Sequence, residues 1–125
     1  MKFGAQSELK LKGVHPDLVK VMSLAIERTT VDFSITEGLR TKERQAELVA
    51  QKKSRTMNSR HLTGHAIDFM AIVDGKGTWV WSYYETIANT IKECAKELGI
   101  EIDWGGDWVG FRDGPHIELD RKAYP

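Results

Sequence analysis

Only one cysteine occurs among the 125 residues, so the chain cannot form an internal disulfide bond and gives no sign of maturing in an oxidising compartment. An excess of charge of one sign is also missing, because 18 basic and 18 acidic side chains cancel and no basic stripe stands out. Proteins that bind nucleic acid through phosphate contacts need clustered basic side chains. We therefore expect no nucleic-acid partner.

Long apolar runs are missing as well. No segment approaches the ~18 apolar residues that a membrane-spanning helix needs. The first residues, MKFGAQSELKLKG, lack the apolar centre of a signal peptide. We expect a protein that is made in a cytoplasm without a signal peptide and does not insert into a membrane. If its target lies outside, another protein must let it through.

The hydrophobic pattern predicts a compact α+β fold. Apolar residues at helical spacing predict three helices, and short runs rich in β-formers predict strands. The helical segments are 15–29, 41–53 and 81–99. The strand segments are 31–36, 66–73 and short pieces of 100–120. At this length we expect one domain with a small, mainly antiparallel sheet.

The alternation of side chains along two of these strands suggests a common functional surface. Neighbouring residues of a strand point to opposite faces of the sheet. In AIDFMAIV (66–73), Asp68 lies on the face opposite the bulky apolar residues. In HIEL (116–119), His116 and Glu118 share the polar face. If both apolar faces look into the core, these acid and imidazole side chains project toward the same side.

A metal site explains this pattern best. The run SRHLTGHAIDF contributes His61 from a loop and Asp68 from a strand, and His116 completes a set of three. A catalytic zinc site uses three such nitrogen and oxygen ligands and leaves one position open. An unpaired carboxylate within an apolar strand is costly, and a metal ion would remove that cost.

Two other interpretations of the same run are weaker. Ser59 lies near histidines, but the sequence has no G-x-S-x-G elbow to expose a serine nucleophile. His61 and His65 have the i, i+4 spacing of helical zinc sites. However, Gly64 lies between them, and Leu62 stands where those sites carry their catalytic glutamate.

A general base can come from the segment DGPHIELD. Asp113 precedes His116 by three residues, and the Gly-Pro between them favours a turn that folds the carboxylate back. Glu118 competes for the same role, because it shares a strand face with His116. The residues alone leave both open.

Three motifs resemble the zinc D-alanyl-D-alanine peptidase-like family, which shares its fold with the hedgehog signalling domain. Residues 59–68 match its S-x-H-x-x-G-x-A-x-D motif, and 113–116 match its acid three residues before the last histidine. EGLRT (37–41), followed by Gln45, is similar to its G-x-R-[S/T]-x-x-x-Q segment. Within the family, residues 103–119 most resemble phage endolysins that act as L-alanyl-D-glutamate peptidases.

The resemblance assigns roles to these residues. It implies one Zn²⁺ per chain on His61, Asp68 and His116, with Asp113 as the general base. It implies that Arg40 is the cation that faces the substrate. A guanidinium beside a metal cleft can bind a carboxylate or stabilise the oxyanion of a tetrahedral intermediate. Glu118 then remains to orient a ligand.

Other residues are predicted to contact the substrate. Gln45, at the start of a helix, is one candidate. Trp104 and Trp108 flank a Gly-Gly pair just before the second motif. They form an aromatic cleft wall for a peptide, or alternatively they cover the core and brace the loop. The family motif leaves the position of His65 unspecified, so its role stays open.

The resemblance therefore implies a function. We expect residues 1–125 to form a single, monomeric zinc peptidase domain without a separate cell-wall-binding domain. It would cleave the L-alanyl-D-glutamate amide of the peptidoglycan stem peptide, as an antimicrobial bacteriophage endolysin does in host lysis. One alternative is a D-alanyl-D-alanine carboxypeptidase or dipeptidase. Another is a non-catalytic hedgehog-like zinc-binding module, against which Asp113 and Arg40 argue.

Overall fold

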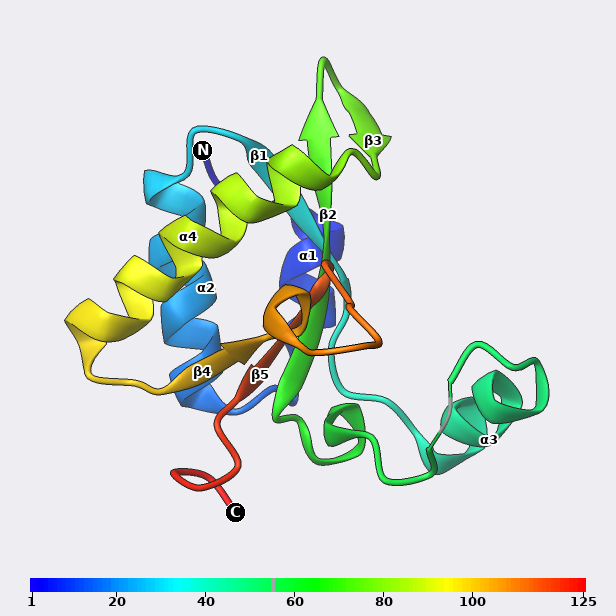
Figure 1. Ribbon diagram of the computed structural model, residues 1–125. Helices are drawn as coiled ribbons and strands as arrows, with labels where there is room; N and C mark the ends of the chain where they lie inside the picture. Colours follow the sequence, from blue (N-terminus) through cyan, green and yellow to red (C-terminus); the bar gives the residue numbers. More distant parts are fainter. Residues whose placement is uncertain (55) are drawn as a thin grey trace.

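The computed structural model describes every residue of the chain except Arg55 (Figure 1). The α-helices are α1 (Ala5–Lys10), α2 (Pro16–Arg28), α3 (Lys42–Ala50) and α4 (Trp81–Leu98). The strands are β1 (Asp32–Glu37), β2 (Ala66–Val73), β3 (Lys76–Thr78), β4 (Ile102–Trp104) and β5 (His116–Leu119). Two short 3-10 helices are η1 (Arg60–Thr63) and η2 (Gly105–Asp107). Within this described part, no helix is long and apolar enough to cross a membrane.

The strands form one antiparallel sheet in the order β1-β2-β5-β4, and β3 also pairs with β2. The register sets Asp68 of β2 opposite His116 of β5 and opposite Glu37 of β1. Residues from three distant parts of the sequence therefore meet at one point of the sheet. The predicted α+β class and antiparallel sheet are confirmed.

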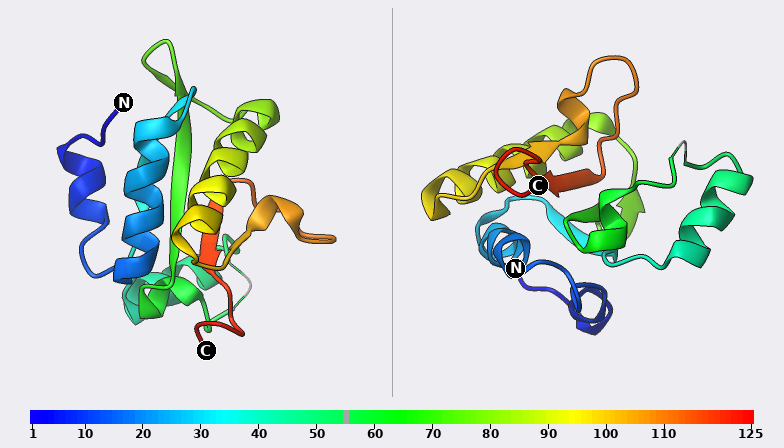
Figure 2. Two further views of the ribbon diagram at one scale, coloured as in Figure 1. Left: turned by 90° about the vertical axis from the view of Figure 1, so that its left-hand side faces the viewer. Right: turned by 90° about the horizontal axis from the view of Figure 1, so that it is seen from below.

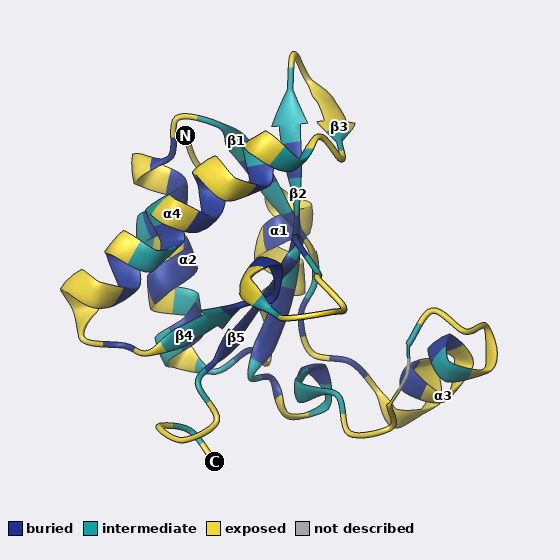
Figure 3. Cartoon of the chain, in the orientation of Figure 1, coloured by how far each residue is buried: buried dark blue, intermediate teal, exposed yellow. Residues whose placement is uncertain are grey.

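Helices α2 and α4 cover one face of this sheet (Figures 1 and 2). Ile67 and Phe69 of β2 point into that layer, and neither has any exposed surface. Asp68, between them, is only half-buried and points to the other side. Figure 3 shows the same division, with the buried sides of α2 and α4 turned inward. The predicted alternation along β2 is thus confirmed, and the apolar face does lie in the core.

Helix α3 lies on the other side of the sheet from α2 and α4 (Figure 1). It is capped at its N-terminus by Thr41, whose hydroxyl accepts a hydrogen bond from the backbone N–H of Arg44. Most of its surface is exposed, apart from Gln45 and Leu48. A polar helix is thus held near the sheet by few buried side chains.

The three predicted helices are present as α2, α3 and α4, and the described residues also form a fourth α-helix. The sequence pattern missed α1, which has six residues and is too short to show a helical period. Its single buried residue is Ser7, whose hydroxyl accepts a hydrogen bond from the backbone N–H of Ile35 at 3.0 Å. Helix α1 therefore docks on β1 through a polar contact that hydrophobicity does not reveal.

Gly38 joins α1 to the functional side of the sheet. A Cβ atom at this position would lie 2.0 Å from the carbonyl oxygen of Lys10 and 2.9 Å from a methyl group of Val14. Only glycine permits this close approach of backbone to backbone. The carbonyl of Gly38 in turn faces the ring of His61, at 2.9 Å from Nδ1.

We predict that Gly38→Ala lowers the free energy of unfolding by about 1–3 kcal/mol, because the new methyl group overlaps backbone that cannot move freely. Urea denaturation measures the change. Gly4→Ala is the matched control, since a Cβ there meets no atom within 4 Å and we expect no comparable loss. Equal effects of the two substitutions would contradict the packing argument.

Candidate metal centre and catalytic cleft

Three side chains from separate elements converge on one point. His61 comes from η1, Asp68 from β2 and His116 from β5, and both imidazoles are buried. One ligand atom of each lies within 4.8 Å of the others. The structure thus brings together the three residues that the sequence predicted as metal ligands.

Each imidazole is oriented by a hydrogen bond at its outer nitrogen, the ring nitrogen that points away from Asp68. Nδ1 of His61 lies 2.9 Å from the carbonyl oxygen of Gly38, and Nε2 of His116 lies 2.9 Å from Oε1 of Glu118. The inner nitrogens therefore face Asp68: Nε2 of His61 is 3.3 Å and Nδ1 of His116 is 3.2 Å from Oδ1. Metal-binding histidines are typically held in this way through their second nitrogen.

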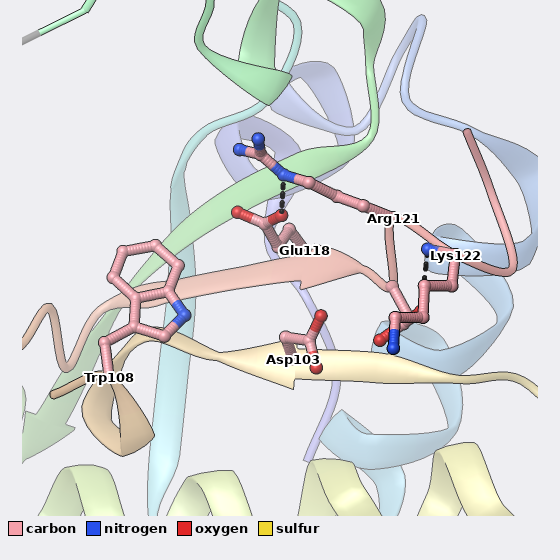
Figure 4. A pocket seen from close by; sticks show the side chains of 6 residues that line it. Asp103, Trp108, Glu118, Arg121 and Lys122 are labelled. Carbon is pink, nitrogen blue, oxygen red and sulfur yellow. Dashed lines mark hydrogen bonds and ion pairs between the residues drawn. The ribbon is translucent and has the colours of Figure 1, made fainter.

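Glu118 is fixed from behind by Arg121, whose Nε donates to Oε2 at 3.1 Å (Figure 4). Its carboxylate, buried between Arg121 and His116, is engaged by both. This geometry favours Glu118 as the residue that orients His116, the role expected from the sequence, over a role as general base.

Asp68 and His116 stabilise each other's charged forms. Burial alone would raise the pKa of Asp68, but hydrogen bonds from His116 and His61 hold it well below its usual range. Burial alone would lower the pKa of His116, but hydrogen bonds to Asp68 and Glu118 raise it to about 9. Without a metal ion, a proton on His116 therefore balances the buried carboxylates.

The same donor set fits a divalent metal ion. Two imidazole nitrogens and one carboxylate oxygen are the three protein ligands of a catalytic site with an open fourth position. A metal ion at this point would replace the proton on His116 as the positive charge that Asp68 faces. These residues could therefore hold a metal ion.

A cleft of about 530 Å³ opens in front of the three ligands. Asp113 lines it together with His61, Asp68 and His116. Burial and the charge of Asp68 raise the pKa of the Asp113 carboxyl above its ordinary value. A carboxylate with a raised pKa is a stronger base, as proton transfer from water requires.

The backbone around Asp113 forms the predicted turn. Its carbonyl accepts a hydrogen bond from the N–H of His116 at 3.2 Å, and its own N–H donates to the carbonyl of Gly105 at 2.9 Å. A Cβ on Gly105 would lie 2.3 Å from the Asp113 carbonyl oxygen, so the approach requires glycine. The turn that starts at Asp113 is thus anchored to the end of β4.

Arg40 lies beside the ligand Asp68 and is only 9% exposed. Its Nε donates to Oε1 of Glu37 and its Nη1 to Oε1 of Gln45, both at 2.7 Å. Its Nη2 is 3.8 Å from Oδ2 of Asp68. The guanidinium is therefore held rigidly beside the ligands and lines the same cleft.

Gln45 does not fit the predicted contact with substrate, because its side chain has no exposed surface. Its amide oxygen accepts from Arg40, and its amide nitrogen donates to Ser54 Oγ and to the carbonyl of Thr56. A buried amide with three partners positions Arg40 and the segment after α3. Sequence spacing alone could not distinguish this position from a helix surface.

The two tryptophans differ. Trp104 is 5% exposed, and its Nε1 donates to the carbonyl of Gly114 at 2.7 Å. It therefore braces the loop, which was the alternative interpretation, and does not fit a substrate contact. Trp108 is half-buried, lines the cleft and lies with its ring centroid 5.1 Å from that of His116. Its position remains compatible with an aromatic cleft wall.

Two supporting residues carried no assigned role in the sequence. Glu37 faces Arg40 because the register of β1 shifts between Ile35 and Glu37, and such a β-bulge breaks the alternation of side chains. Gly38 holds His61 through a backbone carbonyl, which no side-chain pattern records. The ring of His65 lies against His15 and bonds to Thr63, outside the residues that line the cleft.

Comparison with known proteins agrees with this geometry. Residues 1–122 match the family model described as phage L-alanyl-D-glutamate peptidase. The L-alanyl-D-glutamate peptidase of Escherichia phage T5 is 36% identical over 127 residues, which cover 98% of this chain and 92% of that protein. The protein of the same name from Listeria phage A118 is 41% identical over 99 residues, which cover 78% of this chain but 34% of that protein.

A solved structure is also similar. The crystal structure of the Serratia marcescens L-Ala D-Glu endopeptidase ChiX superposes with a TM-score of 0.94 at 48% sequence identity, over 100% of this chain and 94% of that one. The fold is thus that of a peptidase, and its group of His61, Asp68 and His116 could hold a metal ion. The chain belongs to the phage L-alanyl-D-glutamate peptidase family, which confirms the resemblance identified from the motifs.

We predict that metal binding releases about one proton per ion between roughly pH 7 and 8, because His116 must lose its proton to become a ligand. Apparent affinity should rise about tenfold per pH unit and level off above the His116 pKa of about 9. Asp68, already ionised, adds no proton in this range. Calorimetry in buffers of different ionisation enthalpy measures the release; binding without proton release near neutral pH would show that His116 is already neutral.

Proposed function

We propose that residues 1–125 form one catalytic domain, a zinc-dependent endopeptidase that cleaves the L-alanyl-D-glutamate amide of the peptidoglycan stem peptide. The observation that carries this proposal is the group of His61, Asp68 and His116 at the base of a cleft that Asp113 and Arg40 also line. The similarity to the L-alanyl-D-glutamate peptidase of phage T5 and the L-Ala D-Glu endopeptidase of Serratia marcescens supports the choice of bond.

One Zn²⁺ per chain would be held by His61, Asp68 and His116. When bound, zinc supplies Lewis-acid chemistry, polarising a carbonyl group and lowering the pKa of water. Zinc fits because both imidazoles direct their inner nitrogens at one carboxylate oxygen of Asp68, so that the three donor atoms lie close together. The contacts of the outer nitrogens with Gly38 and Glu118 would hold the inner nitrogens in position for the ion.

Asp113 acts as the general base and then as the general acid. Its carboxylate takes a proton from the attacking water and afterwards gives that proton to the nitrogen of the leaving D-glutamate residue. The raised pKa suits both steps, because the group must accept a proton and also release it. Its separation from the ligand group by a turn leaves the carboxylate free to move a proton.

Arg40 stabilises the negative charge that develops on the scissile carbonyl oxygen. Its Nη2 points toward Asp68, while Glu37 and Gln45 fix the rest of the guanidinium. A donor held before the reaction needs no reorganisation during it, and loss of one such donor typically costs about 2.7–4 kcal/mol of transition-state stabilisation.

The biological setting follows from the relatives. Two of them are phage proteins, which supports a role for this chain in lysis of a bacterial host. We infer that it acts as a monomer on the cell wall after synthesis in the host cytoplasm, and that another protein opens the membrane. The stem peptide is its binding partner.

We predict that Asp113→Asn and His116→Ala separate catalysis from metal binding. The first should bind about one zinc ion per chain but hydrolyse cell wall at least ~100-fold more slowly, since it removes only the base. The second should lose zinc. Metal analysis after gel filtration, together with a turbidity assay on permeabilised bacteria, measures both.

Asp107→Asn is the matched control for Asp113, because this aspartate lies in the same loop but is exposed and paired with Lys92. It should retain both activity and zinc. Full hydrolysis by Asp113→Asn would remove Asp113 from the mechanism, and unchanged zinc occupancy in His116→Ala would remove His116 from the ligand set.

We predict that digestion of purified peptidoglycan releases fragments with a free N-terminal D-glutamate, as detected by mass spectrometry. A chelator should stop the digestion, and added Zn²⁺ should restore it. Loss of terminal D-alanine instead would identify a carboxypeptidase. Zinc binding with no cleavage of any amide would identify a non-catalytic binding module.

A further inference from the structure

The cleft contains more positive charge than the proposed chemistry uses. The cationic side chains that line it are Arg40, Lys52, Lys53, Arg60 and Arg121. Arg40 is bonded to Glu37 and Gln45, and Arg121 is bonded to Glu118. Arg60 donates to the backbone carbonyls of Leu119 and Tyr124. Three of the five are thus engaged within the protein.

Lys52 and Lys53 differ from these three. Both follow the end of α3, are exposed and line the cleft. Among the residues that the structure describes, neither lysine forms a salt bridge or a side-chain hydrogen bond. Two ammonium groups therefore line the cleft without a salt bridge to any carboxylate of the described residues.

The backbone at Lys52 adds an independent observation. Lys52 has φ +59°, in the left-handed region that favours glycine. Its N–H bonds to the carbonyl of Val49 at 3.0 Å, and the N–H of Lys53 bonds to that of Leu48 at 2.8 Å. This is the pattern in which a helix normally ends with glycine at the left-handed position. A lysine there strains the backbone, and strain of this kind concentrates at functional positions.

The position of the two lysines relative to the ligand group is fixed through Gln45. Its buried amide accepts from Arg40 on one side and donates to Ser54 and Thr56 on the other. The segment that carries Lys52 and Lys53 is therefore tied to the arginine beside Asp68. An anion bound by the lysines would lie in the same cleft as the scissile amide.

The proposed substrate supplies such an anion. Glutamate has two carboxyl groups, and a residue within a peptide uses only one of them for its onward bond. The D-glutamate that provides the leaving nitrogen therefore retains a second carboxyl group, which is anionic unless it is amidated. Arg40 is bonded to Glu37 and Gln45 and is assigned to the scissile carbonyl oxygen in the proposed mechanism, so this carboxylate needs another cation.

The geometry points to Lys52 and Lys53 as a carboxylate-binding subsite that makes the enzyme prefer stem peptides with an unamidated D-glutamate. This assignment rests on the proposed function, because it assumes that the L-alanyl-D-glutamate amide is the bond that is cleaved. It places the determinant of substrate choice on the segment after α3, apart from the metal ligands.

The test uses two synthetic stem peptides that differ only in a free carboxylate or a carboxamide on D-glutamate, with the zinc-loaded enzyme. Wild type should cleave the carboxylate peptide faster. Lys52→Gly/Lys53→Ala should lower kcat/KM for that peptide roughly tenfold, mainly through KM, and leave the carboxamide peptide unchanged. Lys52→Arg should keep the preference.

A second readout separates binding from structure. Lys52→Gly alone should raise the Tm by about 2 °C, because glycine relieves the left-handed backbone, while it weakens cleavage of the carboxylate peptide. A lysine with a merely structural role would not give these opposite effects. Asp74→Gly is the control: Asp74 also has positive φ but lies in the β2–β3 turn outside the cleft lining, and activity should not change.

The outcomes distinguish the two proposals. Equal cleavage of both peptides by wild type and by the double variant would overturn the lysine subsite and leave the proposed function intact. If wild type cleaves neither peptide, the proposed function fails and the subsite fails with it. A preference for the carboxamide peptide would also overturn the subsite.

Discussion

A carboxylate in the middle of the sheet is the constraint on which the rest of the structure depends. Asp68 interrupts the apolar strand β2, and its neighbours Ile67 and Phe69 are fully buried on the other face. An unpaired charge in this position is costly, so the adjacent strands must supply positive groups. Strand β5 supplies His116, and the segment after β1 supplies Arg40.

This constraint also explains why the supporting contacts extend so far from the ligands. A buried charge is tolerated only when each partner is held and its remaining polar atoms are satisfied. Glu118 and Arg121 complete the bonds of His116, and Glu37 and Gln45 complete those of Arg40. The arrangement of donors and acceptors that suits a metal ion is therefore the same arrangement that keeps the metal-free sheet intact.

The sequence predicted the ligand group because its signal is local and periodic. The alternation along β2 and β5 gave the faces of Asp68, His116 and Glu118 correctly. Contacts that depend on tertiary structure were missed. In the sequence, Gln45 resembles a surface glutamine, and only the fold shows that the loop after α3 covers it. For Trp104 the sequence left a cleft wall and a loop brace both open, and the hydrogen bond from its indole N–H to Gly114 favours the brace. Helix α1 is held by a serine, and Glu37 is turned by a bulge, so neither follows from hydrophobic spacing.

The way in which α3 is attached has an evolutionary consequence. The helix lies apart from the packed layers of sheet, α2 and α4, and it is joined to the metal-binding side mainly through the amide of Gln45 (Figures 1 and 3). The side-chain charges at Lys52 and Lys53 can therefore vary without disturbing the core or the ligand group, because both side chains are exposed. Selection can thus alter the charge of this part of the cleft while the metal-ligand group stays constant, so that the two can evolve as separate traits of one small protein.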